Sequence, residues 1–389
     1  SRWWTEMFLR NGRVCVVDLS AGESSEQELS EDLAGMSALR AAEVLRKEHG
    51  DALVLGTGAL TGSLVPAACA GFISSPRGVM PLLGSAGVEL KLAGFDFIVV
   101  KGESAAPGYL WVRDGIAELV PYPGMSSMDS WARTERIRAD QGDRRIQVVA
   151  SGPWGDALRP GSCLAVSHWL GEDDALTGGE FGRRKLLAVA FRGMGELEVS
   201  DPVAHLSASL DLRAAHASKL GPSAGLASYW DGAKDSGFSA LLHRSMGCYG
   251  CPHPCRSFLK VNEDPRHMAL SVTEPGYLHF DIPSLAKAVS AGLGFKDATS
   301  AFMECAKAGA DPCSVMGPGM SSLEGVRKAL SSGASSPADR LSAAGSFRSL
   351  ATFDECVGLG LCPRYWAKAG LDLGAVSECA EHALGRPLR

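Results

Sequence analysis

Short apolar runs bounded by glycine, proline and aspartate dominate the chain up to about residue 200. Runs of this length and composition are typical of buried strands and hairpin arms. The pattern predicts strands at residues 13–19, 51–58, 95–102, 108–115, 145–152 and 185–193. Residues 25–50 and 127–140 have the apolar spacing of surface helices, with acidic residues in their first turns. We therefore expect an α+β domain over residues 1–203.

After residue 203 the apolar spacing lengthens, and alanine, leucine and serine become frequent. The spacing predicts amphipathic helices at residues 203–220, 225–246, 284–294 and 296–311. Residues 330–346 are rich in serine, alanine and glycine, which is typical of a flexible connection. The predicted fold is thus an α+β N-terminal domain followed by a mainly α-helical domain over residues 204–389.

Composition narrows the class of protein. The chain has 389 residues, of which 46% are hydrophobic, so a sizeable core is expected. The net charge is −6 and the longest basic run is Arg183–Lys185, so nucleic acid is not an expected partner. No apolar stretch approaches the roughly 20 residues of a membrane span, and the first residues lack the apolar core of a signal peptide. We expect a cytoplasmic protein without a membrane span.

Three cysteines are clustered in MGCYGCPHPC, residues 246–255. The chain has 11 cysteines, an odd number, and most of the others stand singly in apolar surroundings, which argues against a complete disulfide framework. Cys248, Cys251 and Cys255 form a C-x2-C-x3-C run on a tight loop. Pro252 and Pro254 fix the local backbone and remove two amide donors. The spacing predicts a metal centre that needs a fourth ligand.

The spacing favours a [4Fe–4S] cluster over zinc. Iron–sulfur clusters commonly draw a ligand from far along the chain, whereas structural zinc sites usually use two paired knuckles, and no second knuckle exists here. Zinc with His253 as a ligand, and unligated thiols, remain the alternatives. The candidates for the fourth ligand are Cys305, Cys313, Cys356, Cys362 and Cys379. We select Cys362, because it follows a glycine-rich turn and precedes a proline, and we place Cys356 second.

Several segments, in the same order, resemble the aldehyde:ferredoxin oxidoreductase family of tungsten bis-pterin enzymes. In the N-terminal half these are LVLGTGALTGSLVP (53–66) and VELKLAGFDFIVVKG (88–102). Further on, GCYGCPHPC (247–255) is similar to the cluster loop of the family, and GLGLCPRY (358–365) to its Gly-Leu-Cys ligand. The resemblance implies that residues 1–203 form the base of a pterin site and that residues 204–389 bind an iron–sulfur cluster. It also implies a ferredoxin-like or other redox partner.

The chain departs from the family at the segments that face the pterin. The Gly-Gly-Arg that holds a pterin phosphate appears here as Cys69-Ala70, and the acidic residue expected after TEPGY is Leu278. The family's full chain is also longer, and most of its third domain has no counterpart here. These changes would leave the phosphates of a pterin poorly paired and remove a carboxylate for proton transfer. The chain therefore resembles a shortened and divergent member.

The resemblance still assigns candidate site residues. The candidate pterin contacts are Gly84, Gly87, Gly179, Arg183 and Asp311, and the candidate proton carrier is His279, with His243 and His253 as further histidines. Each has a structural alternative. The glycines fit turns, Arg183 fits a solvated face, Asp311 fits a helix boundary, and the histidines fit local hydrogen bonding.

Two functions follow from the resemblance. In the first, the chain is a non-catalytic relative with an eroded pterin site that transfers electrons or serves as a redox-complex subunit, for example beside a full-length paralogue. In the second, it is an active, shortened tungsten or molybdenum pterin oxidoreductase acting on an aldehyde or a carboxylic acid. The changed pterin segments favour the first, and the four cysteines argue against a loss of redox function. A homo- or hetero-oligomer is expected in either case, because a shortened chain would expose core surface.

Overall fold

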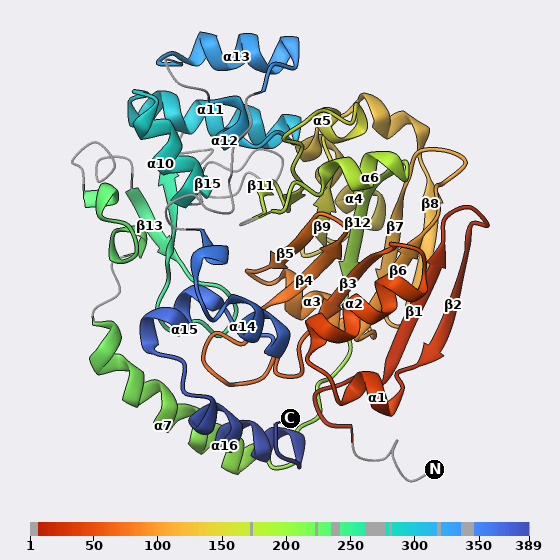
Figure 1. The fold of residues 1–389 in the computed structure, drawn as a ribbon, viewed down its shortest axis with the longest axis vertical. Helices are drawn as coiled ribbons and strands as arrows, with labels where there is room; N and C mark the ends of the chain where they lie inside the picture. Colours follow the sequence, from red (N-terminus) through yellow and green to blue (C-terminus); the bar gives the residue numbers. More distant parts are fainter. Residues whose placement is uncertain are drawn as a thin grey trace.

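The computed structural model describes residues 7–171, 174–221, 225–234, 242–260, 277–279, 282–316, 320–335 and 346–388. Two mixed six-stranded sheets occupy the N-terminal half, and a largely helical part follows (Figure 1). This arrangement confirms the predicted fold class. The division at residues 203 and 204 stays a prediction. No helix in the described ranges is long and apolar enough to cross a membrane.

The first sheet has the strand order β2-β1-β6-β3-β4-β5. Its strands are β1 (Arg13–Asp18), β2 (Glu23–Glu28), β3 (Leu53–Thr57), β4 (Gly71–Ser75), β5 (Gly78–Leu82) and β6 (Phe97–Lys101). β1 and β6 are parallel, and the other pairs are antiparallel. Val54 packs with the buried face of α2 (Ala38–Glu48), whereas its neighbours Leu53 and Leu55 pack with α3 (Ala86–Leu92). β3 is therefore buried on both faces, which explains its continuous apolar run.

The second sheet has the order β11-β10-β9-β12-β7-β8. Its strands are β7 (Gly108–Arg113), β8 (Ile116–Pro121), β9 (Gln147–Ala150), β10 (Ala165–Val166), β11 (Trp169–Leu170) and β12 (Leu186–Arg192). Val149 and Val189 share a core with Ile98 of the first sheet, so the two sheets pack together. The other α-helices of this half are α1 (Glu31–Ala34), α4 (Ser130–Gln141), α5 (Pro153–Asp156) and α6 (Gly178–Arg183).

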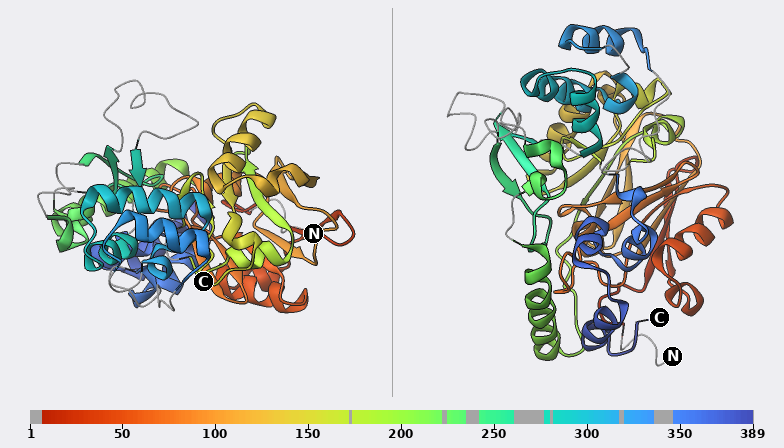
Figure 2. Two further views of the ribbon diagram at one scale, coloured as in Figure 1. Left: turned by 90° about the horizontal axis from the view of Figure 1, so that it is seen from above. Right: turned by 60° about the vertical axis from the view of Figure 1, so that its left-hand side comes forward.

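The helices of the C-terminal half form two groups. One group comprises α10 (Ile282–Ser290), α11 (Phe295–Ala308), α12 (Pro312–Val315) and α13 (Leu323–Ser332). It packs against Trp131 and Trp154 beside the second sheet. The other comprises α7 (Pro202–Leu220), α14 (Phe353–Leu359), α15 (Pro363–Ala369) and α16 (Leu373–Leu384). These helices share a core with α2, and Figure 2 shows α7 running alongside α16.

Two predicted helices are wrong in part. Residues 25–28 belong to β2, which pairs with β1 although all its side chains are exposed. Residues 225–246 contain the 3-10 turns Gly225–Ser228 and Asp231–Lys234 and then strand β13 (Leu242–Met246). β13 forms a three-stranded sheet with β14 (Arg256–Lys260) and β15 (Tyr277–His279). Pairing with β14 across the cysteine loop overrides the local helical spacing. Residues 336–345 of the predicted connection lie outside the described residues.

Candidate metal centre

The cysteine loop connects two antiparallel strands. Met246 at the end of β13 pairs with Arg256 at the start of β14, so the chain reverses within residues 247–255. Gly250 has a φ of 63°, a left-handed conformation that suits glycine. Two backbone hydrogen bonds hold the loop on the N-terminal half: Tyr249 N donates to the Gly84 carbonyl (3.0 Å), and Ala67 N donates to the Gly250 carbonyl (3.1 Å).

Cys362 reaches the same place from the C-terminal helices. It lies between α14 and α15, directly before Pro363, as the sequence predicts. Its backbone N–H donates to the carbonyl of Ala67 (2.9 Å), the residue whose own N–H is bonded to Gly250. Nearby, the buried Trp366 donates its indole N–H to the Pro66 carbonyl (3.0 Å). One N-terminal segment, residues 66–70, thus positions both Cys362 and the cysteine loop.

The thiols of these segments interact with one another. Burial, followed by the charges of Cys248, Cys255 and Cys251, raises the pKa of the Cys362 thiol. Burial, followed by Cys248 and Cys255, raises the pKa of Cys251 to about 12. The four cysteines that the sequence selects are therefore neighbours in a largely buried place, and none of them forms a disulfide.

A fifth thiol, Cys69, belongs to the same group. It is fully buried and hydrogen-bonds with Cys248, and this bond together with burial raises its pKa. The charges of Cys362 and Cys251 act in the same direction. Sequence analysis missed this role, because Cys69 stands in the apolar PAACAGF, which is typical of a core thiol. The available signal was its position in the segment that replaces the family's Gly-Gly-Arg.

The remaining candidate ligands have other surroundings. Cys356 lies inside α14 and its pKa is raised to about 12, mainly by burial. Cys379 lies in α16, 3.3 Å from the hydroxyl of Ser209. Cys305 lies in α11, and burial and then the charges of Asp311, Glu304 and Cys313 raise its pKa.

The possible metal ligands at the cysteine site are sulfur atoms, which are soft donors, and two arginines lie near them. Nη1 of Arg364 lies 3.5 Å from Sγ of Cys255, and Arg256 is buried at the start of β14. Cysteine thiolates are the usual ligands of iron–sulfur clusters, and an adjacent guanidinium offsets their negative charge. Across the described residues, no three Cys, His, Asp or Glu side chains converge with the spacing of ligands around one ion. The residue types fit a cluster, and its ligation stays a prediction.

His253 is buried within the cysteine loop. Its Nδ1 lies 2.7 Å from the hydroxyl of Tyr229, and burial lowers its pKa, so the ring is neutral near pH 7. Its bond to Tyr229 gives it a structural role. The side chains of His243 and His279 lie outside the described residues, as does the side chain of Leu278.

Two candidate pterin contacts, Gly84 and Gly87, lie beside the cysteine site. Gly84 has a φ of 75° and borders a cavity of about 230 Å³ that is also lined by Gln147, Trp169 and Arg256. Gly87 is the second residue of α3, and a Cβ there would lie 2.2 Å from the backbone nitrogen of Gly71. The packing of α3 against β4 therefore explains the glycine at position 87.

The other three candidates lie elsewhere, in α6 and at the start of α12. A Cβ at Gly179 would be 3.3 Å from Oγ of Ser162, and Asp311 N donates to the carbonyl of Gly161 (2.7 Å). Asp311 is fully buried, and its carboxylate accepts from Cys313 N (3.1 Å) and from the Ser314 hydroxyl (3.0 Å), which caps α12.

Arg183 lies on the outer side of α6. It donates to Glu180 at 2.6 Å, and its side chain is 52% exposed. Glu180 also binds Arg184 at 2.9 Å. The structure thus brings Gly179 and Asp311 into one neighbourhood and Gly84 and Gly87 into another, and Arg183 has a carboxylate partner within its own helix.

Comparison with known proteins fits this fold. Residues 14–193, which comprise nearly all of both six-stranded sheets, match the N-terminal domain of aldehyde ferredoxin oxidoreductase. Residues 14–193 are thus assigned to the N-terminal domain family of aldehyde ferredoxin oxidoreductase. It is 27% identical over 213 residues to a tungsten-containing aldehyde ferredoxin oxidoreductase of Thermococcus kodakarensis. That region covers 50% of this chain and 35% of the relative, so the match spans about a third of the relative's length.

Two further comparisons concern another relative and a solved structure. The WOR-like subunit of an aliphatic sulfonate oxidoreductase from Pyrococcus furiosus is 30% identical over 150 residues, which are 32% of this chain and 23% of that protein. Among solved structures, the active-site complex BamBC of benzoyl coenzyme A reductase, with 1,5-dienoyl-CoA, has a TM-score of 0.67 at 17% identity. The alignment covers 96% of this chain and 65% of that one. The shared fold therefore extends through the helical half.

Proposed function

We propose that this chain binds one [4Fe–4S] cluster through Cys248, Cys251, Cys255 and Cys362 and transfers electrons as a subunit of a redox complex. One observation carries the proposal: thiols from two distant segments lie together in a buried place, positioned by the same residues 66–70. A bound cluster supplies one-electron transfer. The protein's part is to shield the centre from water and to place the Arg364 guanidinium beside Cys255.

The raised pKa values argue against a nucleophilic role for these thiols. Burial and mutual repulsion keep these thiols protonated near neutral pH, so they are poor nucleophiles. A nucleophilic role would require a depressed thiol pKa. Iron ions supply the positive charge that would offset the repulsion between four thiolates.

The residues directed at a pterin support a relay rather than a complete pterin enzyme. Gly87 is needed for helix packing, Asp311 caps a helix and Arg183 is paired with Glu180. The cavity beside Gly84 has a volume of about 230 Å³. Pockets that enclose drug-sized ligands typically measure about 300–1,000 Å³. We therefore propose that the pterin site is eroded.

The expected partner is another redox protein. The structural relative is the active-site complex BamBC of benzoyl coenzyme A reductase, which supports a complex in which this chain is one subunit. Within such a complex, a ferredoxin-like protein or a full-length paralogue would exchange electrons with the cluster. A homo- or hetero-oligomer and a cytoplasmic location remain part of the proposal.

A second candidate function is an active tungsten or molybdenum pterin oxidoreductase for an aldehyde or a carboxylic acid. It is favoured by the buried Arg256, which lines the small cavity next to Gly84 and whose guanidinium has the chemistry of a phosphate partner. Tungsten in the names of the archaeal relatives points the same way. In this reading Gly84 and Arg256 hold the pterin, and His279 is the candidate proton carrier.

Metal analysis of anaerobically purified protein separates these functions. The relay predicts about four iron and four acid-labile sulfide per chain, with tungsten and molybdenum below a tenth of an equivalent. Stoichiometric tungsten or molybdenum together with iron would establish the second candidate. One zinc per chain without iron would contradict both.

A further inference from the structure

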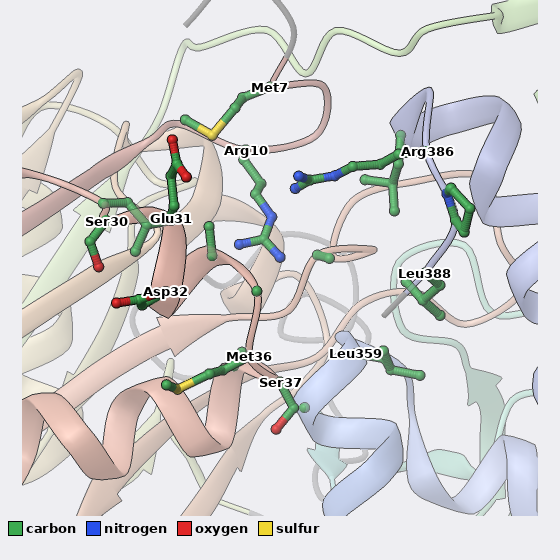
Figure 3. Close-up of a pocket in the computed structure, with 18 of the residues that line it drawn as sticks. Met7, Arg10, Ser30, Glu31, Asp32, Met36, Ser37, Leu359, Arg386 and Leu388 are labelled. Carbon is green, nitrogen blue, oxygen red and sulfur yellow. The ribbon is translucent and has the colours of Figure 1, made fainter. Parts of the chain in front are cut away.

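A large cavity lies between the N-terminal segment and the C-terminal helices, apart from the cysteine site. Its volume is about 680 Å³, and it is bordered by α1, the start of α2, the end of α14 and the residues after α16 (Figure 3). Arg10 approaches from before β1, and Arg386 from the C-terminal end of the described chain. Figure 3 shows their guanidinium groups pointing toward each other across the cavity.

Among the described residues, neither arginine has a carboxylate in an ion pair with it. Within the described ranges, no Asp or Glu oxygen forms an ion pair with Arg10 or Arg386, and the buried Nε of Arg10 has no hydrogen-bond partner. Asp96 is an acid that acts on Arg10, but its carboxylate already accepts from the backbone nitrogen of Gly12 (2.7 Å) and those of Asn11 and Arg13 (both 3.3 Å).

The cavity lining carries charges of both signs, because Glu28, Glu31 and Asp32 line it as well as the two arginines. Burial is the main cause that lowers the pKa of Arg10, and the charge of Arg386 lowers it further, against the opposing effect of Asp96. Directly behind the wall, the fully buried Lys91 donates to the carbonyls of Gly58 (2.8 Å) and Ala59 (3.1 Å), and burial lowers its pKa to about 7, so it is only partly charged near neutral pH. Ala59 also lines the cavity. Partly buried cations that repel each other without a counter-ion are unfavourable, and an anion between them would remove that cost.

We propose that Arg10 and Arg386 bind an oxyanion group, a phosphate or a carboxylate, of a small organic molecule in this cavity. Guanidinium groups bind either oxyanion through paired N–H donors, which would include the free Nε of Arg10. The volume of about 680 Å³ lies in the range of small-molecule pockets. This inference concerns a second site and is independent of the proposed cluster.

The rest of the lining indicates the size and polarity of the molecule. Met36, Leu359 and Leu388 offer an apolar wall for an organic body. Glu31 and Asp32 lie on the side of α1, away from the arginine pair in Figure 3, and would repel a second anionic group. The cavity therefore suits a molecule with one oxyanion at one end and a neutral or cationic opposite end.

Calorimetry and thermal unfolding of the full chain test this site with inorganic phosphate and propionate as separate probes. Binding of either is expected to raise the melting temperature, and the probe that binds identifies the oxyanion. Arg10→Gln and Arg386→Gln are each expected to weaken that binding at least tenfold. Without a probe, the two variants should unfold at or above the wild-type temperature, because each removes an unpaired like charge. Arg40→Gln is the matched control, since Arg40 is paired with the exposed Glu43 on the neighbouring α2.

Three results would overturn the proposal: no binding of either probe at millimolar concentration, binding that both variants retain, or equal weakening in Arg40→Gln. Within the described residues, the side chains of Arg10 and Arg386 form no hydrogen bond that these substitutions would remove, so both variants should fold. If one of them fails to fold, the other carries the test.

Discussion

The cysteine site and the α6–α12 region were both expected to contact a cofactor, but the interactions of their side chains differ. At the cysteine site, five thiols meet, and their main interactions are with one another. Between α6 and α12, Asp311 is used as a helix cap, and Arg183 is paired with Glu180. One region gathers thiols from three separate segments, whereas the other uses its polar groups in structural bonds.

This difference gives a physical criterion for a functional residue. A buried polar group whose bonds are completed by neighbouring backbone atoms contributes to stability. A gathering of thiols that raise one another's pKa is unfavourable only when the thiols ionise, and a bound metal would compensate that charge. The substitutions below test the comparison from the largest expected effect to the smallest.

Cys362→Ser is expected to remove nearly all bound iron. Cys362 is the one proposed ligand outside the cysteine loop, and serine is a poor ligand for an iron–sulfur cluster. Iron content and visible absorption of the anaerobic protein measure the loss. Cys379→Ser, in α16, is the control and should retain iron. Unchanged iron in Cys362→Ser would make Cys69 or Cys356 the next ligand to test.

Gly87→Ala is expected to destabilise the fold by about 3 kcal/mol or more, because the new methyl group would lie 2.2 Å from the Gly71 nitrogen. Gly179→Ala has more room, with Oγ of Ser162 at 3.3 Å, and should cost less than about 1 kcal/mol. Urea unfolding compares the two. A mild effect at Gly87 would show that packing does not explain this glycine and would reopen a role in binding a phosphate.

Asp311→Ala is expected to cost about 1–2 kcal/mol, because it removes the N-cap of α12 at a buried site. Asp372→Ala, which removes the exposed N-cap of α16, should lie at the lower end of the range. Neither substitution should change the iron content. A selective loss of tungsten or molybdenum in Asp311→Ala would instead show that this carboxylate binds a pterin.

Arg183→Gln should change stability by less than about 1 kcal/mol, because its ion pair with Glu180 is half exposed. Arg184→Gln should cost more, since Arg184 is 12% exposed and also donates to the carbonyl of Asp51 (3.0 Å). Thermal unfolding of both variants measures the difference. An equal effect, or a loss of a metal in Arg183→Gln, would argue against a purely structural Arg183.

The pattern of apolar residues correctly predicted the strands whose side chains are buried. The apolar runs at β1, β3, β6, β7, β9 and β12 are buried strands as expected. β2 was not predicted, because ESSEQE has no apolar face and becomes a strand only by pairing with β1. β13 was predicted as a helix for a similar reason, since its partner β14 lies beyond the cysteine loop.

Within the candidate site, the sequence was informative where spacing alone defines the chemistry. The C-x2-C-x3-C run and the turn before Cys362 were sufficient to select four thiols that the fold brings together. Cys69 was missed because its apolar neighbours hide its contact with Cys248. Arg10 and Arg386 line one cavity although they are far apart in the sequence, and no local sequence pattern predicts that they lie near each other.

The most direct test of the proposed cluster is a crystal structure of the anaerobic protein with anomalous diffraction measured at the iron edge. The proposal predicts one strong iron peak that resolves into a [4Fe–4S] cluster bonded to Sγ of Cys248, Cys251, Cys255 and Cys362, with Cys69 hydrogen-bonded beside it. An iron peak bonded to Cys69 instead of Cys362, a zinc peak, or no peak at these thiols would contradict it.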